Sequence, residues 1–109
     1  MENKNYIINT AKRIITEEVE KAGYHVDKII LFGSRAKGNF REDSDYDFFV
    51  VLKQDISRKN ESNLLLKIRR KLAQFKIDND TLISSLSEIK ENNNVGDITY
   101  YALKYGVAI

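Results

Sequence analysis

Two aspartates, Asp45 and Asp47, stand two residues apart at the start of an apolar segment of the chain. On a β-strand, side chains two residues apart point to the same face, roughly 6.6 Å from one another along the strand. Carboxylates placed in this way can lean together and hold two metal ions about 3.5–4 Å apart, as in two-metal phosphoryl transfer. An isolated Asp-x-Asp is more often a solvated turn, so the pair indicates a metal site only through its surroundings.

A phosphate-binding turn is predicted just before this pair. Gly33 and Ser34 directly follow a run of apolar residues, and ten residues separate them from Asp45. Glycine lets the backbone approach a ligand closely, and consecutive free N–H groups at a helix start bind anions. The Ser34 hydroxyl can add a hydrogen-bond donor, while Arg35 and Lys37 supply positive charge beside the same anion. Combined with the aspartates, this turn indicates a site for a triphosphate and its metal ions.

The hydrophobic pattern predicts the elements that position these residues. In chain order they are a helix over 6–22, strands at 26–32 and 46–52, a helix over 57–75, a third strand within 77–84, a short helix around 88–92 and a final helix over 98–105. Gly23 follows the first helix where a left-handed residue is common, and we expect Ser57, Ser87 and Asp97 to cap the later helices. The order predicts one α/β (α+β) domain over residues 1–109, a small mixed sheet with helices packed on one face.

Composition excludes several other kinds of site. The 109 residues contain no cysteine and a single histidine, His25, which rules out disulfides, thiol nucleophiles and zinc sites built on cysteine or clustered histidine. Any metal must be bound by carboxylates, which favours Mg²⁺ or Mn²⁺. The 18 basic and 16 acidic side chains nearly balance, so we expect no direct nucleic-acid partner. No apolar run is long enough for a bilayer or a signal peptide, which predicts a cytoplasmic protein with no membrane contact.

Four basic residues, at positions 67 and 69–71, crowd the middle of the second long predicted helix. A solvated helical face is the favoured interpretation of such a run. The alternative is a docking surface for an acidic patch on a partner, and the sequence leaves this open.

The segment GSRAKGNFREDSDYDFFV, residues 33–50, closely resembles the signature of the DNA polymerase β-like nucleotidyltransferase superfamily. Its form is most similar to the smallest branch, the minimal nucleotidyltransferase (MNT) domains, which are the antitoxins of HEPN–MNT toxin–antitoxin pairs. The flanking strands and the closing segment GDITYYALKYGVAI also fit, so the resemblance covers nearly the whole chain. It implies the polymerase β-like nucleotidyltransferase fold.

The resemblance also implies a role for each residue of the motif. Asp45 and Asp47 would ligate two Mg²⁺ ions, while Gly33 and Ser34, with Arg35 beside them, would bind the phosphates of ATP. The implied reaction is an in-line displacement in which metal ions activate the acceptor hydroxyl and neutralise the leaving pyrophosphate.

A third carboxylate is expected from the next core strand, where Asp78 and Asp80 are both candidates. Asp80 fits the spacing of the family better, because strand-forming residues follow it and Glu88 comes eight residues later. Asp80 would then be a metal ligand, and it could also accept the proton of the acceptor hydroxyl.

The implied activity is the transfer of AMP from ATP to a hydroxyl group. Larger members of the superfamily carry extra domains that bind the acceptor, whereas this chain is expected to take its acceptor from a partner surface. The resemblance implies a HEPN ribonuclease toxin that is modified on a tyrosine and silenced, in a hetero-oligomer with its antitoxin. Two alternatives remain open: a non-catalytic antitoxin that blocks the toxin by binding, and a nucleotidyltransferase that acts on a small molecule.

Overall fold

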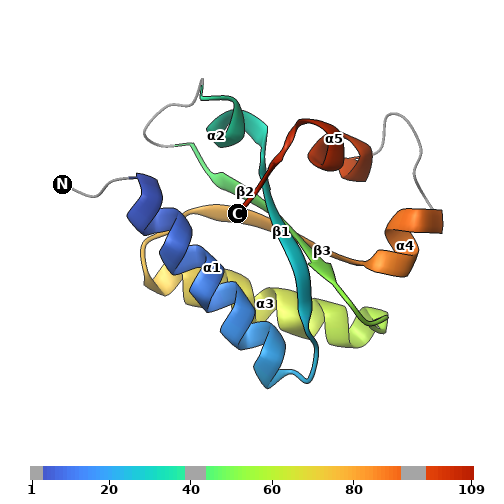
Figure 1. Cartoon of the computed structure of the whole chain (residues 1–109). Coiled ribbons are helices and arrows are strands. Elements are labelled where there is room, and N and C mark those ends of the chain that lie inside the picture. The colour runs from blue at the N-terminus through green and yellow to red at the C-terminus, as the bar shows by residue number, and fades with distance from the viewer. Residues whose placement is uncertain (1–3, 39–43, 92–97) are drawn as a thin grey trace.

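The computed structural model describes residues 4–38, 44–91 and 98–109 of the chain (Figure 1). The elements in chain order are α1 (Lys4–Lys21), β1 (Val26–Phe32), α2 (Gly33–Lys37), β2 (Tyr46–Leu52), α3 (Arg58–Gln74), β3 (Asn79–Ser85), α4 (Leu86–Glu91), α5 (Ile98–Tyr105) and β4 (Val107–Ala108). The strands predicted at 26–32 and 46–52 are confirmed at their predicted bounds. No helix within the described ranges is long and apolar enough to cross a membrane.

The described strands form one mixed sheet in the order β3-β2-β1-β4. β1 runs antiparallel to both β2 and β4, whereas β2 and β3 are parallel. Parallel neighbours need a long crossover connection, and α3 provides it. The predicted mixed sheet is therefore confirmed, with β3 as one of its two edge strands.

Helices cover both faces of this sheet, which corrects the prediction that they pack on one face only (Figure 1). α1 and α3 cover the larger core, to which β2 contributes Phe48, Val50 and Leu52. α5 covers the opposite face, where Ala102 packs against Phe49 and its neighbours. The apolar run of β2 is continuous, so both of its faces are buried and each needs a cover.

The helix caps agree in part with the sequence. The Ser57 hydroxyl accepts a hydrogen bond from the backbone N–H three residues on, at 3.2 Å, which confirms it as the N-cap of α3. Ser87 was the wrong choice for α4, because this helix begins at Leu86 and Ser87 lies inside it. The Ser85 hydroxyl instead accepts from the N–H of Glu88, at 3.3 Å. Asp97, the predicted cap of α5, lies outside the described residues.

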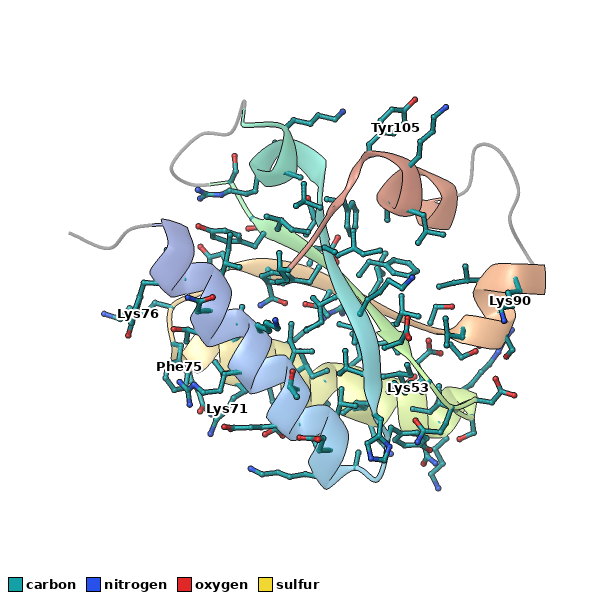
Figure 2. All side chains as sticks on the ribbon, in the orientation of Figure 1. Lys53, Lys71, Phe75, Lys76, Lys90 and Tyr105 are labelled. Carbon is teal, nitrogen blue, oxygen red and sulfur yellow. The ribbon has the colours of Figure 1, made fainter. Side chains whose placement is uncertain are left out.

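The last turn of α5 is held against β1 through a glycine. The helix ends at Tyr105, which is its predicted last residue. β4 follows Gly106 and pairs with Ile30 and Leu31, and the sequence did not indicate this strand. Tyr105 points away from the sheet and is 53% exposed (Figure 2). The side chain by which α5 packs on the sheet is that of Ala102, which is buried. A Cβ on Gly106 would overlap the Ile30 side chain and the Ala102 carbonyl oxygen.

We predict that Gly106→Ala lowers the free energy of unfolding by about 2–3 kcal/mol, because the added methyl group must push α5 and β4 away from β1. Urea unfolding measures the change. Gly23→Ala is the comparison: its Cβ would meet no atom within 4 Å in the part of the chain that the structure describes, so only the strain of φ +93°, about 1 kcal/mol, is expected. A Gly106→Ala protein as stable as the parent would contradict this packing.

Candidate active site

The predicted site residues come from three strands whose ends meet at one end of the sheet. Asp47, the second residue of β2, pairs with Phe32 at the end of β1 and with Asp80 near the start of β3. Gly33 directly follows Phe32 and opens α2. The pairing therefore brings together Gly33, Asp47 and Asp80, which lie far apart in the sequence.

Gly33 approaches Asp47 more closely than any other residue type could. Its φ is +74°, a left-handed conformation that glycine adopts without a steric penalty. A Cβ built at this position would overlap the carboxylate oxygen Oδ2 of Asp47. The positive φ favours glycine, and any larger residue would have to displace the Asp47 carboxylate. Since α2 begins here, the first N–H groups of Gly33 and Ser34 have no carbonyl partner within the helix.

The electrostatics of Asp47 are those of a crowded acidic group. Burial raises the pKa of its carboxyl above the ordinary value, and repulsion from Asp80 and then from Asp45 raises this pKa further. A cation bound among the three carboxylates would offset their repulsion and favour the ionised form of Asp47. Asp45, just before β2, is exposed, so the cluster opens to solvent.

The register of β3 distinguishes the two candidates for the third carboxylate. Asp80 pairs directly with Asp47, and paired residues of neighbouring strands point to the same face. Asp78 precedes the strand, and its carbonyl oxygen accepts a hydrogen bond from the N–H of Tyr46 at 2.9 Å. This geometry favours Asp80 as the partner of Asp47.

Comparison with known proteins assigns the family. The family model described as polymerase beta, nucleotidyltransferase, matches residues 7–105. The chain belongs to this nucleotidyltransferase family. Among solved structures it is similar to a toxin–antitoxin MntA–HpeT mutant, with a TM-score of 0.57 at 16% identity over 92% of this chain and 69% of that one. It is also similar to a toxin–antitoxin structure with AMP-PNP, with a TM-score of 0.56 at 16% identity over 89% and 70% of the two chains. No curated protein matches significantly.

Arg35 of this nucleotidyltransferase is engaged in contacts that the sequence did not predict. Its side chain is only 9% exposed, and its Nε and Nη2 donate to the Ser44 carbonyl oxygen at 3.2 and 2.9 Å. Its guanidinium carbon lies 4.3 Å from the centroid of the Tyr46 ring, a cation–π contact. Arg35 therefore ties α2 to the entrance of β2 and holds the two halves of the motif together. Phosphate binding by Arg35 stays a prediction.

The donor chemistry at this end of the sheet suits a hard cation, since carboxylates are the ligands that Mg²⁺ prefers. The repulsion that Asp80 and Asp45 exert on Asp47 points the same way. Over the described ranges, however, no three acidic side chains converge closely enough to enclose one ion. The backbone thus places the predicted ligands as neighbours, while their side chains are not yet gathered around a common point.

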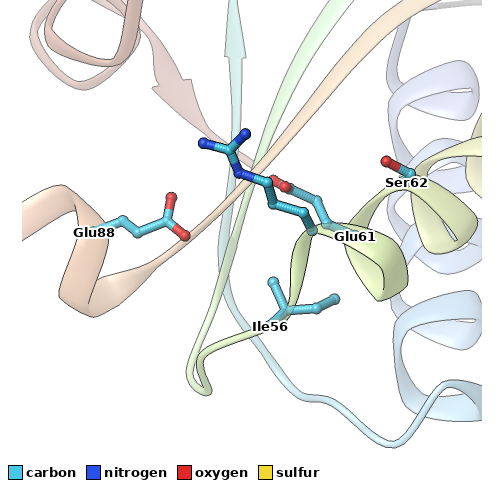
Figure 3. A pocket seen from close by; sticks show the side chains of 5 residues that line it. Ile56, Glu61, Ser62 and Glu88 are labelled. Atoms are coloured by element: carbon cyan, nitrogen blue, oxygen red, sulfur yellow. The ribbon is translucent and has the colours of Figure 1, made fainter.

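A separate pocket of about 500 Å³ lies at the opposite end of β2 and β3. It is lined by Ile56, Arg58, Glu61, Ser62 and Glu88, which come from the start of α3, the loop before it and α4 (Figure 3). Burial and then repulsion from Glu88 raise the pKa of Glu61, and Arg58 opposes this rise. None of the predicted site residues lines this pocket, so it is distinct from the nucleotidyltransferase motif.

We predict that Gly33→Ala reduces the binding of Mg²⁺ and ATP by about tenfold or more, because its Cβ displaces the Asp47 carboxylate. Isothermal titration calorimetry provides the measurement. The matched control is Gly38→Ala, since Gly38 also has a positive φ, +81°, but a Cβ there would meet no atom of the described residues within 4 Å. Both substitutions introduce backbone strain of about 1 kcal/mol, but only Gly33→Ala should weaken the binding of Mg²⁺ and ATP. Equal losses would refute the close-approach argument.

We predict that Asp47→Asn unfolds at a higher temperature than the parent at pH 7.5 with EDTA present. Ionised Asp47 destabilises the fold through burial and repulsion, and the amide removes that charge. Because the folded-state pKa is raised, the parent gains stability as the pH falls through it and Asp47 takes up a proton. The difference in melting temperature should therefore narrow towards pH 4. Asp78→Asn, outside the strand pairing, should show neither effect; a lower melting temperature for Asp47→Asn would contradict the assignment.

Proposed function

We propose that the protein is a Mg²⁺-dependent nucleotidyltransferase that moves AMP from ATP onto a hydroxyl group of a partner protein. The observation that carries the proposal is the pairing of Asp47 with Asp80, with Gly33 directly against the Asp47 carboxylate. Family membership supports the reaction class independently of this geometry.

Asp45, Asp47 and Asp80 are the residues that would hold two Mg²⁺ ions. When bound, these ions would polarise the acceptor hydroxyl and offset the charge of the triphosphate. The N–H groups of Gly33 and Ser34 at the start of α2, with the Ser34 hydroxyl, would donate to phosphate oxygens. Arg35 would contribute by fixing α2 relative to β2, on the contacts described above.

The transfer itself exchanges one bond to phosphorus for another. The acceptor oxygen forms a bond to the α-phosphorus of ATP as the bond from that phosphorus to the bridging oxygen breaks, and pyrophosphate leaves. The proton of the acceptor hydroxyl goes to the carboxylate of Asp80, which lies nearest the open edge of the sheet. Positioning of the two reactants supplies most of the rate, so the protein needs no covalent intermediate.

For the acceptor we propose a tyrosine of a cognate HEPN ribonuclease toxin, whose silencing would make this protein an antitoxin. The likeness to structures of a toxin–antitoxin MntA–HpeT mutant and of a toxin–antitoxin with AMP-PNP, an ATP analogue, supports this choice at the level of the fold. The two proteins would form a hetero-oligomer in the cytoplasm. Alternatively, the protein blocks the toxin by binding alone, or it modifies a small molecule.

The test is to incubate the protein with Mg²⁺, ATP and the product of the neighbouring gene, and to record the intact masses of both chains. We expect the partner to gain one or more adenylyl groups. Asp47→Asn and Asp80→Asn should lower the rate by about 100-fold or more, because each removes a charge that binds the metal. Asp78→Asn, a substitution of the same kind two residues from Asp80, should keep the activity.

Three other results would each redirect the proposal. A stable complex of unchanged masses would favour the binding antitoxin. If Asp78→Asn loses activity and Asp80→Asn keeps it, the third metal ligand is Asp78 and not Asp80. Consumption of ATP without modification of the partner would favour a small-molecule acceptor.

A further inference from the structure

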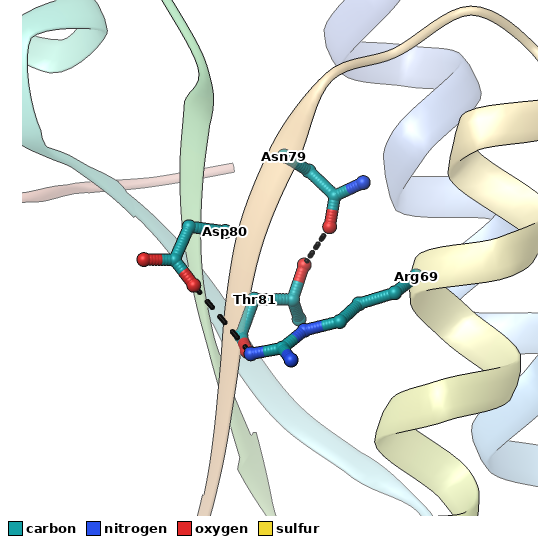
Figure 4. A network of polar contacts seen from close by, with 4 residues as sticks. All are labelled: Arg69, Asn79, Asp80 and Thr81. Carbon is teal, nitrogen blue, oxygen red and sulfur yellow. Dashed lines mark hydrogen bonds and ion pairs between the residues drawn. The ribbon is translucent and has the colours of Figure 1, made fainter.

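One of the basic side chains of α3 reaches around the edge of the sheet to the site (Figure 4). The Arg69 Nη2 donates to the carbonyl oxygen of Thr81 at 2.9 Å and lies 3.5 Å from the Asp80 carboxylate oxygen Oδ1. Asp80 is the residue that pairs with Asp47 across β2 and β3. Arg69 is therefore in direct contact with a carboxylate of the predicted active site, and it is more than part of a solvated helical face.

The guanidinium of Arg69 is held by a hydrogen bond to a backbone carbonyl oxygen of β3 as well as by the ion pair with Asp80. β3 is an edge strand among the described residues, so the Thr81 carbonyl oxygen takes a side-chain donor, Arg69, in place of a neighbouring strand. The Thr81 hydroxyl donates to Asn79 Oδ1 at 2.7 Å, and Asn79 Nδ2 donates to the Ile77 carbonyl oxygen at 3.1 Å. These bonds order the strand on which Asp80 stands, and Arg69 is anchored to that strand.

This contact bears on how Asp80 could bind a metal ion. Asp80 is adjacent to Asp47 in the strand pairing, yet the acidic side chains of the described residues do not gather around one point. One carboxylate oxygen of Asp80 already lies 3.5 Å from the positively charged guanidinium of Arg69. A metal ion that takes Asp80 as a ligand must therefore compete with this arginine.

We propose that Arg69 is an internal competitor of the metal ion for Asp80. It neutralises the third carboxylate while the site is empty of cations and releases it when metal and nucleotide bind. This inference rests on the proposed function, because it assumes that Asp80 is a metal ligand. Arg69 is here a positioning residue, since it acts through Asp80 and not on the substrates.

The size of the effect follows from the exposure of the pair. The side chains of Arg69 and Asp80 are 44% and 59% exposed, so solvent screens their attraction. A divalent cation carries twice the charge of a guanidinium and can be held by several carboxylates at once, so it displaces the arginine. Removing Arg69 should therefore tighten metal binding by a modest factor, about threefold to tenfold at low salt.

The experiment measures Mn²⁺ binding to the full chain by electron paramagnetic resonance of the free ion, without nucleotide. We expect Arg69→Gln to bind Mn²⁺ about threefold to tenfold more tightly than the parent. Arg70→Gln removes the same charge from the next position of α3, where the structure shows no ion pair to a described residue, and it should stay within about twofold of the parent. In an Asp80→Asn background, Arg69→Gln should not change the Mn²⁺ affinity further, because the carboxylate for which Arg69 and the metal compete is absent.

The outcomes separate this inference from the function on which it rests. If the parent binds Mn²⁺ and Arg69→Gln binds it equally or more weakly, Arg69 does not compete and the inference is overturned. If Arg70→Gln tightens binding as much as Arg69→Gln, the effect is one of net charge and the inference is again overturned. If no variant binds Mn²⁺, the proposed metal site itself fails. Circular dichroism of each variant confirms that the fold is intact.

Discussion

The parallel pairing of β2 with β3 is the constraint on which the candidate site depends. Its register sets Asp47 opposite Asp80, and slipping by one residue would turn Phe48 and Val50 of β2 out of the core beneath α1 and α3. Burial of these side chains outweighs the repulsion between two partly solvated carboxylates. Burial and then the repulsion from Asp80 raise the pKa of Asp47. The hydrophobic core therefore keeps close together two carboxylates that repel each other.

The sequence predicts the part of this arrangement that follows from periodicity. The bounds of β1 and β2 could be read from the apolar runs at 29–32 and 48–52 that they contain, whereas the register that sets Asp47 opposite Asp80 could not. The position of α5 on the second face could not be read, because a helical pattern shows that a face is apolar without showing which surface it covers. β4 has two residues, too few to form any pattern.

The arginines show the limit of such prediction most clearly. Arg35 and Arg69 are both cations near a predicted anion or carboxylate, and the sequence predicts the observed contacts of neither. Their partners are set by tertiary structure: the Ser44 carbonyl and the Tyr46 ring for Arg35, and the edge of β3 for Arg69. A motif thus identifies the charged residues of a site, while the fold decides which of them support it and which contact its ligands.

Because β3 is an edge strand, the identity of the acceptor could change without a change in the site residues. No further strand of the described chain lies beyond β3, so under the proposed function an acceptor hydroxyl would approach Asp80 from the edge of the sheet. Selectivity would then come from surfaces that surround the reacting atoms and not from the shape of an enclosed cavity. Substitutions on those surfaces could exchange one acceptor for another while the carboxylates and the glycine turn stay unchanged.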